Sequence, residues 1–166
     1  RAYITDSVPE LVNRTCSMLE RYGQGAIPPA AAVGCAVDDE PLRQAALGLA
    51  AAVEQAMERV EFSAALEAVM RVVTQANQYI EATAPWKLAK AKETTRLHGV
   101  LHVLAEVICI VAITLEPFMP SVAEAMWQQL GCRGPRHLQD ALRWPGVPPG
   151  QVIGPHPVLF PRANGK

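Results

Sequence analysis

An apolar repeat with a helical period constrains the fold of this chain more than any other feature of its sequence. Between positions 62 and 80, apolar residues recur at spacings of four, three, four, three and four, which places them on one face of an α-helix. These residues are Phe62, Leu66, Val69, Val73, Ala76 and Ile80. Such a stripe must be covered by other helices, so the repeat predicts a helical bundle. The composition agrees, because alanine is abundant and only 5% of the residues are aromatic.

Three further segments carry helix signals before and after this repeat. A capping box at Ser7–Glu10 predicts the start of a first helix, which should end near Gly23. Asp38 or Asp39 can cap a second helix that runs to Val60. The segment from about 92 to 115 is the most apolar, so we expect it at the centre of the bundle.

The C-terminal part of the chain changes character near Gly131. A second capping box at Ser121–Glu124 predicts a short helix that ends at this glycine. We therefore expect an all-α bundle of about five helices over residues 1–131. Residues 132–166 are rich in proline and glycine and predict an extended tail, which packs back on the bundle or on a domain outside this sequence.

A Pro-Trp pair follows the helix that carries the repeat. Pro85 disfavours the α conformation at Ala84, so the helix should break there and Trp86 should leave from a turn at the end of the bundle. A tryptophan beside the positive charges of Lys87 and Lys90 can stack on a nucleic-acid base. By itself, however, a tryptophan in such a place is more often part of the core or its rim, and both interpretations stay open.

Polar residues on the first predicted helix form a second candidate surface. Asn13, Ser17 and Arg21 are spaced four residues apart and lie along one stripe. Asparagine offers a donor and an acceptor, and arginine offers a fork of donors, so these side chains can bind base edges. On spacing alone, an ordinary solvated face is the better interpretation.

Charge and motifs exclude several classes of function. The 15 basic and 16 acidic residues give a net charge of −1, which argues against a general nucleic-acid coat. The apolar run at 99–115 is broken by His102 and Glu106 and is short for a bilayer span, so no membrane segment is expected. The chain has no glycine-rich phosphate loop, nucleophile elbow or convincing carboxylate pair, and we assign no catalytic residue.

The cysteines and histidines do not predict a metal site. The four cysteines are far apart in sequence and are expected to be reduced, buried thiols; they are Cys16, Cys35, Cys109 and Cys132. His98 and His102 are four residues apart but have no third ligand at a suitable spacing. No metal or cofactor is therefore expected within these residues.

Five segments of the chain resemble methionyl-tRNA synthetases, which are class I aminoacyl-tRNA synthetases. They occur in the order of that family: LVNRTCSMLERYGQGAIP at 11–28, FSAALEAVMRVVTQAN at 62–77, NQYIEATAPWKLAK at 77–90, LEPFMPSVAEAMWQQLG at 115–131 and LFPR at 159–162. The resemblance implies the C-terminal helical bundle of the family, which binds the anticodon of methionine tRNA.

The resemblance also implies roles for individual residues. It implies that Trp86 stacks on an anticodon base with Pro85 as its neighbour. The helix that reads the first anticodon base then corresponds to the stripe of Asn13, Ser17 and Arg21. Phosphate contacts are expected from Lys87, Lys90 and Arg14.

Two departures from the family pattern affect these roles. Many members have leucine, glycine and asparagine where this chain has Val8, Pro9 and Glu10, so any contact from that asparagine is lost or replaced. Glu10 could accept a hydrogen bond from a cytosine, although a capping role is the simpler interpretation. Ser17 stands where some members carry asparagine, which weakens its assignment as a base reader.

The intact enzyme implied by the resemblance activates methionine with ATP and magnesium and transfers it to the tRNA. Its HIGH and KMSKS signatures would lie outside this sequence, which begins without methionine and is expected to be a fragment. The short C-terminus is similar to that of monomeric enzymes from mitochondria and some bacteria, so we expect the mitochondrial matrix, with the bacterial cytoplasm as the alternative. The competing function is a helical scaffold domain that keeps the fold without binding tRNA.

Overall fold

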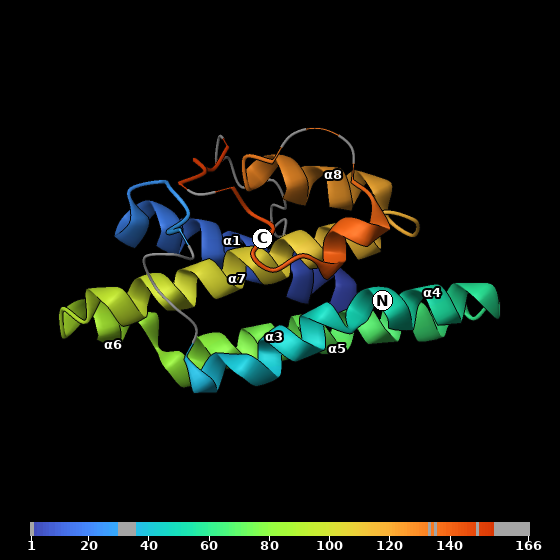
Figure 1. Cartoon of the computed structure of the whole chain (residues 1–166), viewed down its shortest axis with the longest axis horizontal. Helices are drawn as coiled ribbons and strands as arrows, with labels where there is room; N and C mark the ends of the chain where they lie inside the picture. Colours follow the sequence, from blue (N-terminus) through green and yellow to red (C-terminus); the bar gives the residue numbers. More distant parts are fainter. Residues whose placement is uncertain (1, 30–35, 133, 135, 149, 155–166) are drawn as a thin grey trace, which may run out of the picture.

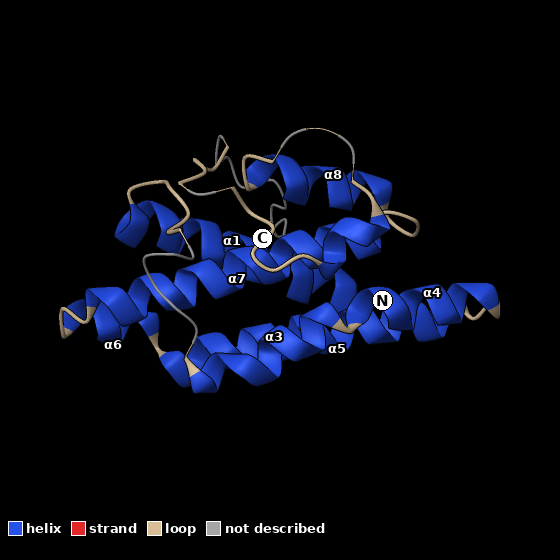
Figure 2. Cartoon of the chain, viewed as in Figure 1, coloured by secondary structure: helices blue, strands red, loops and turns tan. Residues whose placement is uncertain are grey.

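The computed structural model describes residues 2–29, 36–132, 134, 136–148 and 150–154. Within them the chain forms seven α-helices and two short 3-10 helices (Figures 1 and 2). The elements are α1 (Ala2–Gly23), η1 (Val37–Asp39), α3 (Glu40–Leu47), α4 (Leu49–Glu58), α5 (Phe62–Thr83), α6 (Pro85–Lys90), α7 (Thr94–Leu115), α8 (Pro120–Gln129) and η2 (Leu138–Leu142). The predicted all-α bundle is confirmed.

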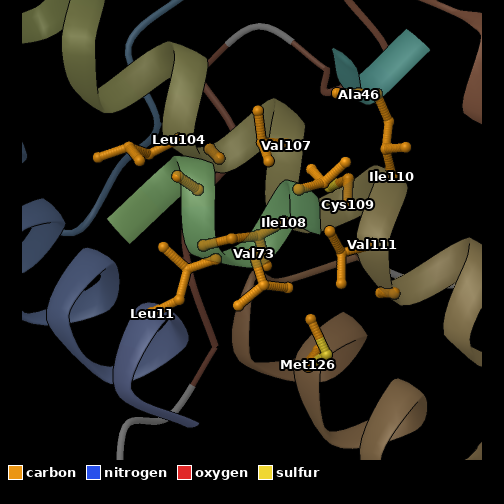
Figure 3. Close-up of a cluster of buried hydrophobic side chains, with 14 of the residues drawn as sticks. Leu11, Ala46, Val73, Leu104, Val107, Ile108, Cys109, Ile110, Val111 and Met126 are labelled. Carbon is orange, nitrogen blue, oxygen red and sulfur yellow. The ribbon is translucent and has the colours of Figure 1, made fainter. Parts of the chain in front are cut away.

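Helix α7 is the centre of the bundle, as its apolar sequence predicts. Every residue from Gly99 to Leu115 is buried, and α7 contacts α1, α3, α5, α6 and α8. Helices α3, α4 and α5 lie on one side of α7 and α8 on the other (Figure 1). Leu11, Val73, Ile108 and Met126 come from four different helices and meet in the core (Figure 3). Although α7 is long and apolar enough to cross a membrane, 94% of its most apolar window is buried inside the fold.

The start of α1 differs from the prediction. The helix begins at Ala2, so Pro9 lies inside it and the capping box at Ser7–Glu10 does not mark its start. An internal proline removes one backbone hydrogen bond. The side chains of Val8, Leu11 and Val12 are completely buried around this point, which offsets that loss.

The second capping box is also wrong as a helix start. Helix α8 begins at Pro120 after the N-cap Met119, which makes no side-chain capping hydrogen bond. Glu124 instead accepts a hydrogen bond from Arg136 at 2.6 Å. A distant arginine therefore replaces the local partner that the sequence pattern suggests.

The predicted second helix is divided into α3 and α4 at Gly48. Its apolar stripe is buried as expected at Leu42, Leu49 and Val53, but Val60 is 68% exposed. Phe62, the first residue of the apolar repeat, is 51% exposed. Both residues lie in or beside the turn that joins α4 to α5, where the helices that cover the rest of the stripe no longer reach.

The described part of the tail packs on the bundle. Glu106 of α7 accepts hydrogen bonds from the backbone amides of Gly146 at 2.8 Å and Val147 at 3.0 Å. Farther on, the amide of Ile27 donates to the carbonyl of Gln151 at 2.8 Å, which joins the tail to the loop after α1. The described part of this tail contains one short element, η2. The LFPR motif at 159–162 lies outside the described residues.

Candidate nucleic-acid interface

The corner between α5 and α6 positions Trp86. Helix α5 ends as predicted at Ala84, which has left-handed backbone angles of φ 45° and ψ 68°. Pro85 then occupies the first turn of α6, where its missing N–H costs no helical hydrogen bond. Trp86 therefore projects from a short helix rather than from an open turn, which corrects the sequence prediction.

The two faces of α6 differ in character. Pro85 is buried, and Leu88 and Ala89 pack against the core. The opposite face carries Trp86, which is 41% exposed, together with the exposed Lys87 and Lys90. Because residues 86 and 90 are one helical turn apart, an accessible indole and two ammonium groups share one surface.

The other two tryptophans have different surroundings. Trp127 and Trp144 are half-buried, and each ring lies against an arginine side chain: Arg136 is 5.7 Å from the Trp127 ring and Arg43 is 5.8 Å from the Trp144 ring. These cation–π contacts bind both rings to side chains of the same chain. Among the described residues, Trp86 has no such contact, so its ring is the accessible one.

The polar stripe of α1 is partly exposed. Ser17 and Arg21 are exposed, and Arg21 lies in the last turn of α1 with no ion pair to any residue in the described ranges. Asn13 is half-buried, and its Oδ1 accepts a hydrogen bond from Gln129 of α8 at 3.5 Å. The C-terminal end of α1 and helix α6 lie toward the same end of the molecule (Figure 1, left). The exposed part of the stripe is thus at the end that carries Trp86.

The three residues predicted to contact phosphate are not equivalent. Arg14 donates to Glu81 of α5 at 2.6 Å and forms an ion pair with Glu10 at 3.6 Å. It therefore already joins α1 to α5, and Glu10 is its partner rather than a capping group. Lys87 and Lys90 have no ion pair within the described part of the chain, so their charges are available to a ligand.

A buried polar network holds the corner in place, and the sequence analysis missed it. The carboxylate of Asp39, which is completely buried, accepts hydrogen bonds from the hydroxyl of Tyr79 at 2.6 Å and from Arg96 at 2.9 Å. Burial and the adjacent Asp39 raise the pKa of Tyr79, and the hydrogen bond to Asp39 raises the pKa of Arg96. Tyr79 precedes α6 and Arg96 follows it, so Asp39 ties both flanks of the corner together. The presence of Tyr79 in the segment at 77–90 was the only available signal.

A second contact connects this region to α1. The side-chain amide of Asn77 donates to the backbone carbonyl of Ser7 at 3.3 Å. It links the α5 helix to the helix that carries Arg21. This hydrogen bond and the Arg14–Glu81 ion pair both join α1 to α5. They therefore hold the polar stripe of α1 in place relative to the end of α5, from which α6 and Trp86 follow.

His102 has structural surroundings. His102 is buried, and its Nδ1 lies 2.7 Å from the carbonyl oxygen of Pro28. Its Nε2 is 3.5 Å from Glu106. Within the described ranges, no group of three or more histidine, cysteine or acidic side chains is placed to hold a metal ion.

Comparison with known proteins gives a consistent family. Residues 42–150 match the family described as the anticodon-binding domain of tRNA ligase. The chain is 34% identical to a methionine–tRNA ligase of Halalkalibacterium halodurans over 97% of its own length and 24% of that protein. It is 38% identical to a methionine–tRNA ligase of Bacillus subtilis over 77% of its length and 19% of that protein. The chain thus spans about a quarter of the length of the curated relatives it matches.

Solved structures agree with the sequence comparisons. The free form of Mycobacterium tuberculosis methionyl-tRNA synthetase superposes with a TM-score of 0.83 at 29% identity, covering 95% of this chain and 32% of that one. The methionyl-adenylate complex of the same enzyme superposes with a TM-score of 0.81.

Proposed function

This chain belongs to the family of anticodon-binding domains of tRNA ligases, and we propose that it recognises the anticodon of methionine tRNA within a methionine–tRNA ligase. The observation that supports this proposal best is the exposed face of α6, where Trp86 lies beside Lys87 and Lys90. The whole enzyme would attach methionine to its tRNA with ATP and magnesium, using catalytic residues outside this chain.

Stacking on Trp86 supplies affinity. An aromatic side chain stacked on an unpaired base contributes about 1–3 kcal/mol and tolerates any base, because every base has an aromatic face. The ring needs both access and a fixed direction. The exposure of Trp86 gives a base access to the ring, and the burial of Pro85 and the packing of Leu88 fix the direction of the helix that carries it.

Hydrogen bonds from α1 supply discrimination between bases. Arg21 is the best candidate, because its five N–H donors are exposed and have no carboxylate partner among the described residues. Ser17 lies one turn before it on the same stripe. Asn13 is the least accessible of the three, since its amide oxygen already faces Gln129.

The proposal also covers the oligomeric state and the compartment of the whole enzyme. We propose a monomer, which light scattering of the whole enzyme would test. We propose the mitochondrial matrix, with the bacterial cytoplasm as the alternative; the named relatives are bacterial and support the alternative. The coding sequence upstream of Arg1 tests the compartment, because a mitochondrial enzyme needs a basic amphipathic leader there.

Substitution of Trp86 tests the stacking contact. We expect Trp86→Ala to weaken binding of a methionine anticodon stem-loop by about 5- to 150-fold, which is the loss of about 1–3 kcal/mol. The matched control is Phe62→Ala, which removes another exposed aromatic ring at the α4–α5 turn and should leave the affinity unchanged. Equal affinities of wild type and Trp86→Ala in a fluorescence titration at fixed salt would contradict the proposal.

Substitution of Arg21 tests base discrimination. The wild-type protein should prefer a stem-loop with cytosine at the first anticodon position, and Arg21→Ala should lose about 1–3 kcal/mol of that preference. Arg71→Ala is the control, because Arg71 is also a highly exposed arginine but lies on α5. If Arg21→Ala discriminates as well as wild type, another residue reads the base. If wild-type protein does not distinguish methionine from non-cognate stem-loops at all, the scaffold interpretation holds instead.

A further inference from the structure

Two cysteines that are far apart in sequence lie side by side in the fold. Cys109 belongs to α7 and Cys132 follows α8, yet their sulfur atoms are 3.7 Å apart. The chain reversal after α8 brings Cys132 to this position. Its amide donates to the carbonyl of Trp127 at 3.0 Å, and the amide of Gly131 donates to that of Gln128 at 2.9 Å. This is a Schellman end, which fixes the direction in which Cys132 leaves the helix.

Only glycine fits at position 131 of this turn. Its φ of +78° is left-handed, and a Cβ atom there would lie 2.0 Å from the carbonyl oxygen of Val152. The tail therefore crosses directly over the turn. Cys109 is held by the central helix α7, and Cys132 by the glycine turn and the tail that crosses it.

The thiols face a cavity that admits a small molecule. A cavity of about 440 Å³ is lined by Cys109, Cys132, Trp127 and Gln151 together with other residues of α7 and the tail. A water molecule occupies roughly 30 Å³ in the liquid, so the space accommodates an oxidant of the size of hydrogen peroxide. The two sulfurs are thus both adjacent and reachable.

The two thiols are chemically different. The sulfur of Cys132 accepts a hydrogen bond from the side-chain amide of Gln151 at 3.2 Å, and the sulfur of Cys109 lies within hydrogen-bonding distance of it. The hydrogen-bonding contacts with Cys109 and Gln151 lower the pKa of Cys132, whereas the contact with Cys132 and burial raise the pKa of Cys109. Since the thiolate is the nucleophile, Cys132 is the sulfur that reacts first.

We propose that Cys109 and Cys132 form a peroxide-reactive dithiol that closes to a disulfide bond. The Cys132 thiolate attacks one oxygen of a hydroperoxide; an S–O bond forms, the O–O bond breaks, and the leaving oxygen takes up a proton as water or an alcohol. The Cys109 sulfur then attacks the Cys132 sulfenic acid. The S–S bond forms, the S–O bond breaks, and hydroxide leaves with the Cys109 proton as water, so two thiols are oxidised and one peroxide is reduced.

The product is compatible with the fold. The sulfurs must approach from 3.7 Å to about 2.05 Å, a shift that side-chain rotation and a small adjustment of the turn can supply. The bond would join positions 23 residues apart and enclose the end of α7 and all of α8. A cross-link of this size restricts the unfolded chain and raises the melting temperature.

Cys16 provides an internal control. It is completely buried in α1, and burial together with Glu20 raises its pKa to about 12. No other cysteine sulfur lies beside it within the described residues. Cys16 therefore lacks both properties that make Cys132 reactive, which are a neighbouring thiol and a lowered pKa.

Peptide mapping of the oxidised protein tests the proposal. We expect hydrogen peroxide treatment of the native protein, followed by alkylation under denaturing conditions, to yield one cross-linked peptide pair containing Cys109 and Cys132, two hydrogens lighter than the reduced pair. Cys16 should be alkylated fully. The melting temperature should rise by about 5–10 °C and return to its original value with reductant.

Two variants separate this reaction from general thiol oxidation. Cys109→Ser should stop at the Cys132 sulfenic acid, which a dimedone-type probe labels, and Cys16→Ala should oxidise as wild type does. Recovery of Cys109 and Cys132 as free thiols after peroxide would overturn the proposal. So would a bond from Cys132 to Cys35, or labelling of Cys16 as rapidly as Cys132.

Discussion

The carboxylate of Asp39 shows how much of this fold depends on single polar contacts. A fully buried charge is costly unless it is paired and hydrogen-bonded. Here the Tyr79 hydroxyl and the Arg96 guanidinium bind one carboxylate oxygen each, at 2.6 Å and 2.9 Å. Since Tyr79 lies on α5 and Arg96 on α7, the same contacts that satisfy Asp39 also join the helices that precede and follow the Trp86 helix.

Removal of the Tyr79 hydroxyl isolates one of these contacts. We expect Tyr79→Phe to lower the free energy of unfolding by about 1–3 kcal/mol, because one oxygen of a buried carboxylate loses its donor. Chemical denaturation measures the change. Tyr22→Phe is the control, since the Tyr22 side chain is only half-buried and should tolerate the loss of its hydroxyl within about 0.5 kcal/mol.

The raised pKa of Tyr79 also predicts the direction in which the stability of the protein changes with pH. Burial and Asp39 raise the pKa of Tyr79 in the folded state, so the folded protein keeps its phenol proton where the unfolded chain loses it. The contribution is therefore fully present below the ordinary tyrosine pKa near 10 and is lost as the pH rises above it. Tyr79→Phe should lose less stability between pH 9 and 11 than wild type, and parallel curves for the two proteins would refute the linkage.

At the scale of helices, the α5–α6 corner depends on an unfavourable backbone conformation. Ala84 has a φ of 45°, which is left-handed, and Pro85 prevents it from continuing α5. A left-handed conformation costs a non-glycine residue roughly 1–2 kcal/mol. This cost falls on Ala84, the residue at which the chain turns from α5 into α6.

Glycine at this position should relieve the strain. We expect Ala84→Gly to raise the free energy of unfolding by about 0.5–1 kcal/mol, because glycine adopts positive φ without a Cβ clash. Ala91→Gly is the control; Ala91 ends α6 with a φ of −80°, so glycine there should lower stability by up to about 1 kcal/mol. Denaturant unfolding of both variants measures the two changes, and a loss of stability in Ala84→Gly would show that the strain is not real.

The same elements show what sequence reasoning can supply. The ends of α5 and α7 followed from apolar spacing and from Pro85, since both signals are local. The starts of α1 and α8 were wrong, because the burial of Val8 and the pairing of Glu124 with Arg136 are tertiary effects. No local pattern shows that Asp39 meets Tyr79 across 40 residues of sequence.

The candidate site was predictable to a similar extent. The Pro-Trp pair predicted the break at the end of α5, and the structure places an exposed Trp86 there; the role of this corner in binding stays a prediction. The exposure of the Trp86 ring could not be predicted, because it depends on which face of α6 packs against the core. The half-burial of Asn13 and the pairing of Arg14 with Glu81 were also hidden, since both involve partners on other helices.

At the scale of the whole molecule, a chain with a net charge of −1 must concentrate positive charge to hold a polyanion. Lys87 and Lys90 are exposed on α6, and Arg21 is exposed in the last turn of α1. Helix α6 and the C-terminal end of α1 lie toward the same end of the molecule (Figure 1). Most other arginines in the described part of the chain are paired with carboxylates, as Arg14, Arg96 and Arg136 illustrate. Lys87 and Lys90 are therefore expected to carry the salt dependence of the proposed tRNA binding.

Neutralising both lysines tests this distribution of charge. Each phosphate contact to single-stranded nucleic acid contributes about 0.7 to the slope of log K against log salt concentration. We expect the Lys87→Gln and Lys90→Gln double variant to reduce that slope by about 1.4 for an anticodon stem-loop. Because phosphates carry no base identity, cognate and non-cognate stem-loops should weaken equally.

A double variant with the same net charge provides the comparison. Arg59→Gln and Arg71→Gln remove two exposed positive charges from the α4–α5 hairpin, at residues outside the candidate interface. If the lysines contact phosphate locally, this control should keep the wild-type slope. If both double variants lower the slope equally, the effect comes from the overall charge of the molecule, and the tRNA backbone does not lie along α6.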